Sequence, residues 1–100
     1  MATTTKALFR GAASTSSTLL YTVPASTTTV VTNIAVTNTS GSDATFTLLL
    51  DDVSIGTTVT VGGFDTTVID LKQVLATTKT IKGLASAVTV NFHISGVEIA

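Results

Sequence analysis

Hydrophobic and polar residues alternate along most of this chain in short runs, and clusters of small polar residues and glycine separate the runs. Alternation with a period of two is typical of β-strands that bury one face. No segment has the length of a stable isolated helix. The strands predicted in this way cover residues 18–23, 29–38, 44–51, 55–61, 66–71, 79–84 and 88–94, with an additional short edge strand at 6–10.

The runs 29–38 and 44–51 flank the turn-forming sequence TSGSD, which predicts that they pair as an antiparallel hairpin. Gly96 is predicted to mark a β-bulge in the last strand, after which Val97 and Ile99 take over the apolar face. The residues predicted to share core-facing sides of their strands are Val30, Ile34, Val36, Phe46, Leu48, Leu50, Ile69, Leu71, Val88, Val90, Phe92 and Ile94.

Seven to eight short strands in 100 residues predict a single-domain, all-β, antiparallel β-sandwich. The layout is expected to be jelly-roll-like; an immunoglobulin domain is disfavoured because the chain has neither tryptophan nor cysteine. Within this domain, residues 1–17 are predicted to form a flexible N-terminal arm with the edge strand, and residues 18–100 the sandwich.

The charge content is low, and this narrows the range of partners. Charged residues make up 11% of the chain and the net charge is −1, so there is no basic surface for nucleic acid or for an anionic membrane. Long apolar strands with few charges pair with other chains when their edges are exposed. Self-association into a homo-oligomer is therefore expected. The N-terminus does not resemble a signal peptide, which favours synthesis and folding in the cytoplasm.

Residues that carry chemistry are sparse, and we expect no catalytic residue, metal site or cofactor. His93 is the only histidine, and one histidine without cysteine makes a poor metal site. Asp51 and Asp52 are expected to form a turn, with Ca²⁺ binding as the less favoured alternative. No nucleophile is paired with a base, so the protein is not expected to be an enzyme.

Six residues are candidates for contacts with other subunits. Two aromatic residues lie outside the strongest strands and are expected to act as anchors, two cationic residues flank one of them, His93 is expected on an outer face, and the single tyrosine needs a partner for its hydroxyl if it is buried. These candidates are Lys6, Phe9, Arg10, Tyr21, Phe64 and His93.

Several segments resemble structural proteins of small tailed-bacteriophage virions. The resemblance lies in "LYTVPA", a Thr/Val-rich strand, "TNTSG" and "ATFTL", and it continues through VIDLKQVLATTKTIKGLAS and VTVNFHISGVEI. It implies an oligomeric β-sandwich subunit, often a trimer, that serves as a capsid decoration or cement protein or in tail-associated fibres and knobs. Where such proteins commonly have glycine after "VPA", this chain has Ser26, which makes the tight turn expected there less certain.

The resemblance implies the major capsid protein as a partner and the virion, assembled in the host cytoplasm, as the location. Residues 2–17 would then lie along a capsid subunit by strand addition. The alternative is a tail or head fibre module that contacts the host surface. A small hydrolase and a non-viral carbohydrate-binding or surface-layer domain are less favoured, because the sequence lacks the catalytic groups of the first and the signal peptide of the second.

Overall fold

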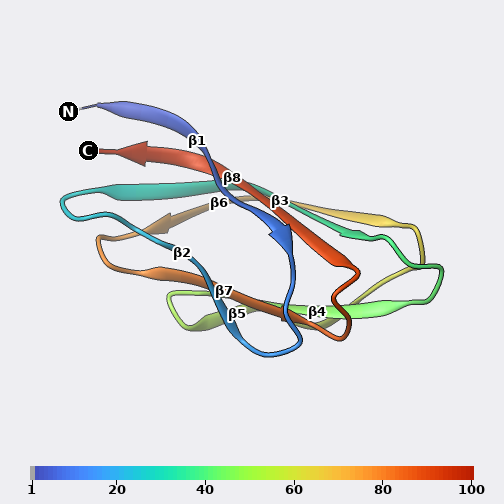
Figure 1. Ribbon diagram of the computed structural model, residues 1–100. Helices are drawn as coiled ribbons and strands as arrows, with labels where there is room; N and C mark the ends of the chain where they lie inside the picture. Colours follow the sequence, from blue (N-terminus) through green and yellow to red (C-terminus); the bar gives the residue numbers. More distant parts are fainter. Residues whose placement is uncertain (1) are drawn as a thin grey trace.

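Two four-stranded antiparallel sheets pack face to face in the computed structural model, which describes residues 2–100 (Figure 1). These residues include no helix long and apolar enough to cross a membrane. The strands are β1 (Thr3–Ala12), β2 (Thr18–Thr22), β3 (Thr28–Asn38), β4 (Ala44–Leu50), β5 (Val53–Val61), β6 (Thr66–Leu75), β7 (Thr80–Ala85) and β8 (Val90–Ile99).

The strand order is that of an eight-stranded jelly roll, which confirms the predicted fold class. Sheet A has the order β1-β8-β3-β6 and sheet B the order β2-β7-β4-β5. Within residues 2–100, β4 and β5 are the only consecutive strands that share a sheet, and every other connection crosses from one sheet to the other. Both chain ends lie together, with Ala2 and Ala100 exchanging backbone hydrogen bonds of 3.0 and 2.8 Å.

The predicted hairpin of residues 29–38 and 44–51 is wrong. β3 pairs with β6 and β8, whereas β4 pairs with β5 and β7 in the other sheet. The loop 39–43 therefore crosses the sandwich. Two strands that each carry an apolar stripe can bury it side by side or facing each other, and the local pattern is the same in both cases.

The core lies between the sheets and is centred on Phe46 and Phe92, whose rings meet edge to face with centroids 6.2 Å apart. The predicted core-facing sides of β4 and of the first half of β8 are confirmed, since Leu48, Leu50, Val90 and Ile94 are also buried. Val88, in contrast, precedes β8 and is 65% exposed.

β-Bulges change which residues of sheet A face the core. Thr32 is an extra residue of β3 relative to β8, and it reverses the alternation, so that Val31 is fully buried while Val30 lies on the outer face. The prediction that Val30 shares the inner face with Ile34 was therefore wrong. The extra residue in β1 is Leu8, opposite the Ile94–Ser95 step.

Gly96 is not itself the site of the bulge predicted in the last strand. It pairs in register with Lys6 and with Val31, and the irregularities lie on the two flanking strands. Glycine is required here because a Cβ atom would lie 2.4 Å from the Val30 carbonyl oxygen and 2.8 Å from a methyl carbon of Leu8. The inner face of β8 then continues through Glu98, and Val97 lies on the outer side.

Most of the segment predicted as an N-terminal arm is part of the sandwich. The edge strand expected at residues 6–10 extends over Thr3–Ala12, where β1 pairs with β8 along its whole length. Leu8 and Ala13 belong to the buried core. A boundary at residue 17 thus does not separate an arm from a domain in residues 2–100; Met1 lies outside the described residues.

Candidate assembly surfaces

Phe64 is the most exposed large hydrophobic residue of the described chain, with 78% of its surface accessible. It lies in the loop 62–65 between β5 and β6, and its φ angle of 56° is in the left-handed region, which is costly for a bulky side chain. Its backbone N–H donates a 2.8 Å hydrogen bond to the carbonyl of Ser40 in the loop 39–43. Phe64 thus lies outside the strands, as the sequence analysis expected.

Close packing of two loops holds Phe64 outward. A Cβ atom at Gly63 would lie 2.3 Å from the carbonyl oxygen of Gly41, so the loops approach backbone to backbone at this point. The Gly63 N–H also donates a 3.1 Å hydrogen bond to the carboxylate of Asp43. The aromatic ring lies beside Gly41, and it is presented on a loop pair fixed by the backbone.

Asn38 fixes the base of this loop end. Its side chain is fully buried and donates a 2.6 Å hydrogen bond to the carbonyl of Ser42, while its oxygen accepts from the Ser40 N–H and from the Thr89 hydroxyl. The loop 86–89 is thereby tied to the loop 39–43. Val88 is exposed on this loop at the same end of the sandwich, so we name the loops 39–43, 62–65 and 86–89, with Phe64 and Val88, the loop-end surface.

The candidates Lys6, Arg10 and His93 lie on strands of sheet A. Arg10 and His93 are register partners on β1 and β8, and both are exposed on the outer face. Lys6 lies nearer the chain ends, with its Nζ atom 3.4 and 3.5 Å from the two carboxylate oxygens of Glu98. The structure thus brings Arg10 and His93 together and places Phe64 at the loop end.

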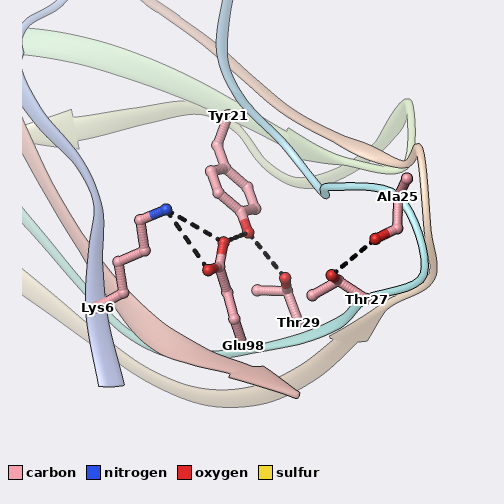
Figure 2. Close-up of polar contacts among 6 residues, drawn as sticks. All are labelled: Lys6, Tyr21, Ala25, Thr27, Thr29 and Glu98. Carbon is pink, nitrogen blue, oxygen red and sulfur yellow. Dashed lines mark hydrogen bonds and ion pairs between the residues drawn. The ribbon is translucent and has the colours of Figure 1, made fainter. Parts of the chain in front are cut away.

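Tyr21 and Phe9 are less available to another subunit. The bulge at Leu8 turns both Leu8 and Phe9 toward the core, against which Phe9 packs half-buried. Tyr21 is 8% exposed, and its hydroxyl donates to Glu98 and accepts from Thr29, whose oxygen is 2.8 Å away (Figure 2). The prediction that a buried tyrosine needs a hydroxyl partner is confirmed.

The Tyr21–Glu98 contact shifts the pKa values of both groups. Burial, followed by the hydrogen bond with Glu98, raises the pKa of Tyr21 to about 12, because both disfavour the phenolate. The hydrogen bond from Tyr21 lowers the pKa of Glu98, with a further contribution from Lys6, and outweighs the opposite effect of burial. Figure 2 shows these side chains meeting between the two sheets, near the loop where Thr27 donates to the Ala25 carbonyl.

Asp51 and Asp52 form the predicted turn. They are the two central residues of the β4–β5 hairpin, and their φ angles of 55° and 60° fit a type I′ turn. Each carboxylate forms an ion pair with a lysine. The Oδ1 atom of Asp51 lies 3.5 Å from Nζ of Lys79, and the Oδ1 atom of Asp52 lies 2.8 Å from Nζ of Lys82. No group of three or more potential metal ligands is found among residues 2–100.

The outer edge of β6 was not recognised from the sequence. Val68 and Val74 are 58% and 66% exposed there, and Asp70 and Lys72 lie between them. Together with Thr32 and Leu71, the two charged residues line a shallow open depression. The prediction ended this strand at Leu71, because the adjacent polar residues Lys72 and Gln73 interrupt the alternation; in the structure the strand continues to Leu75.

Neither the comparison with protein-family models nor the search of curated proteins finds a match to this chain.

Proposed function

We propose that this chain is a non-enzymatic structural protein of a bacteriophage particle, a capsid decoration or cement protein that self-associates and binds the shell of major capsid protein. The proposal joins the sequence resemblance to the surface chemistry of the sandwich. Its partners are other copies of the chain and the major capsid protein, and its location is the virion, after assembly in the host cytoplasm.

The observation that carries the proposal is the placement of Phe64. A phenylalanine that is 78% exposed and in the left-handed region of φ costs stability in the isolated subunit. Aromatic residues held rigidly at a surface are typical of the few anchors that dominate protein–protein interfaces. The loop-end surface presents Phe64 and Val88 on loops that are fixed by Asn38, so little ordering is needed on binding.

The same observation favours the tail or head fibre module as the second candidate. A sandwich 45 Å long with an aromatic residue exposed at one end also suits contact with a host surface. Copy number separates the two roles. A decoration protein is present at a number comparable with that of the major capsid protein, and a fibre or tail protein at a small fraction of it.

The first experiment measures this ratio in purified particles by mass spectrometry with isotope-labelled peptides of both proteins. A copy number comparable with that of the major capsid protein supports the decoration role. A copy number that is a small fraction of it supports the fibre role instead. Absence of the chain from the particle would overturn both.

A binding experiment then tests the loop-end surface. Val88→Ser and Phe64→Ser are expected to weaken binding to shells that lack the protein, each by about tenfold or more. Val53→Ser is the matched control, because Val53 and Val88 are both 65% exposed and Val53 lies at the opposite end beside the Asp51–Asp52 turn. Equal binding by all three variants would remove the loop-end surface as the attachment site.

A further inference from the structure

β6 has an unpaired outer edge, and its residues 68, 70, 72 and 74 are exposed. β6 is the terminal strand of sheet A, and β3 is its sheet neighbour. Among residues 2–100, the loop and turn backbone hydrogen bonds do not involve residues 67–75. Its outward backbone groups are therefore free to pair with a further strand.

The side chains along this edge are self-complementary. When two copies of β6 pair antiparallel with Leu71 opposite Leu71, Asp70 lies opposite Lys72 of the other copy, and Val68 lies opposite Val74. Directly opposed residues on one face of an antiparallel pair have Cβ atoms about 4.5–5.5 Å apart, within reach of an ion pair or an apolar contact. Each of these pairs occurs twice, because the arrangement has two-fold symmetry.

The charges needed for this pairing are not used by ion pairs within the subunit. The ion pairs of the described residues are Lys6–Glu98, Lys79–Asp51 and Lys82–Asp52. Asp70 accepts a 3.2 Å hydrogen bond from the side-chain amide of Asn33, which leaves its second oxygen for another donor. Lys72 and Asp70 thus remain as an acid and a base on one exposed edge.

We propose that a second copy of this chain binds at the β6 edge, antiparallel and with Leu71 on the two-fold axis, so that the two A sheets become one continuous eight-stranded sheet. The proposal rests on the self-association stated in the proposed function, and it assigns a surface and a register to that self-association. It does not depend on attachment to a shell.

The other strand edges are poorly suited to the same contact. Antiparallel self-pairing of β1 about Leu8 would place Lys6 opposite Arg10, and like charges in opposed positions are destabilising. β5 is interrupted by register shifts, with Thr58 at a φ angle of 50°. β2 has five residues and a register shift after Leu19. β6 also has one register shift, with Leu71 and Lys72 opposite Thr32 of β3, but it is ten residues long, has no positive φ angle and keeps residues 68, 70, 72 and 74 exposed.

The mass of the protein in solution, measured by light scattering after size-exclusion chromatography, is the first test. The proposal expects about twice the chain mass of 10.2 kDa, with dissociation on dilution. A particle of three times the chain mass would overturn it, because a three-fold ring is built from heterologous contacts and not from a self-paired edge. A monomer at all concentrations would overturn it as well. In either case the copy number on the particle still tests the decoration role separately.

Charge reversal tests the register. Asp70→Lys and Lys72→Asp each create two like-charge pairs and are expected to weaken dimerisation by about tenfold. The double variant Asp70→Lys/Lys72→Asp restores opposite charges across the axis and is expected to recover wild-type dimerisation. Arg10→Asp is the matched control, since it makes the same charge change as Lys72→Asp on the other edge of sheet A. Failure of the double variant to recover would overturn the register.

Cysteine cross-linking gives an independent measurement, because the chain contains no cysteine. Val68→Cys and Val74→Cys are both on exposed positions, so neither is expected to disturb the fold. In the proposed register, a mixture of the two variants forms a disulfide-linked dimer under mild oxidation, and each variant alone does not. Cross-linking of either variant with itself, or of no combination, would contradict the proposal.

Discussion

The hydroxyl of Tyr21, on β2 of sheet B, donates a hydrogen bond to the carboxylate of Glu98, on β8 of sheet A, across 77 positions of sequence. This contact joins the two layers at the end of the sandwich where the chain termini meet. Thr29 on β3 and Lys6 on β1 complete it, so that four strands contribute to one polar cluster. Among residues 2–100, no buried side-chain polar atom is left without a partner.

Replacing Tyr21 with phenylalanine is expected to destabilise the fold without changing its shape. The variant Tyr21→Phe removes a hydrogen bond to a charged acceptor and leaves the hydroxyl of Thr29, which is fully buried, without its partner. A hydrogen bond to a charged group contributes about 1.5–3 kcal/mol, so we expect a loss of about 2 kcal/mol in the free energy of unfolding. Urea denaturation followed by circular dichroism measures it. An unchanged midpoint would show that the cluster does not stabilise the sandwich.

The stability of the protein is expected to fall at both ends of the pH range through this pair. The pKa of Glu98 is lowered in the folded state, so the unfolded state binds more protons as the pH falls below the ordinary value of 4.5, and stability decreases there. The pKa of Tyr21 is raised from 10.0 to about 12, so the unfolded state loses its proton first, and stability decreases as the pH rises between these values.

Both limits of this pH dependence can be measured separately. Tyr21 is the only tyrosine and the chain has no tryptophan, so the absorbance of tyrosinate reports this one group. Its titration is expected near the ordinary value in denaturant and about two pH units higher in the folded protein. Glu98→Gln should remove the part of the loss of stability at acid pH that Glu98 causes. Tyr21→Phe should remove the part of the loss of stability at alkaline pH that Tyr21 causes. A native tyrosine that titrates at its ordinary pKa would contradict the hydrogen-bonded geometry.

The presence and approximate position of the strands were predictable from the sequence, but their pairing was not. Alternation located β4 and the side of it that carries Phe46, Leu48 and Leu50, because that period follows directly from strand geometry. Which strand lies beside β4 depends on contacts far apart in sequence. The Asp51–Asp52 turn was predictable because its two strands are neighbours in both sequence and space.

The candidate surfaces were predictable only in part, because β-bulges change which face of a strand a residue lies on. At Thr32 and at Leu8 one extra residue reverses the alternation, and a threonine or a leucine at that point fits either face. The sequence therefore misassigned Val30 and gave no sign that Phe9 turns inward. Phe64 was predictable because it stands outside any strand pattern, next to two glycines.

The substitutions Gly96→Ala and Gly62→Ala test whether close packing around Gly96 requires a residue without a Cβ atom. Gly96→Ala places a Cβ atom within 2.4 Å of the Val30 carbonyl oxygen, so β3 or β8 must shift, and we expect a loss of about 2–3 kcal/mol. Gly62→Ala places its Cβ atom no closer than 3.6 Å to any atom outside its chain neighbours and is expected to change stability by about 0.5 kcal/mol or less. Equal effects of the two substitutions would refute the role assigned to Gly96.

Ser26 is the position where the sequence resemblance expected glycine, and the turn forms there with Ser26 at a φ angle of 56°. A left-handed conformation costs a residue with a side chain about 1–2 kcal/mol, and glycine avoids this cost but loses more freedom on folding. Ser26→Gly is therefore expected to stabilise the protein by about 0.5 kcal/mol, as measured by thermal or urea unfolding. Ser17→Gly is the control: Ser17 is exposed and does not have a positive φ angle, so only the entropic loss applies, and stability should fall by about 0.5–1 kcal/mol. If both variants were destabilised equally, the left-handed conformation at Ser26 would carry no cost, and the same argument applied to Phe64 would lose its support.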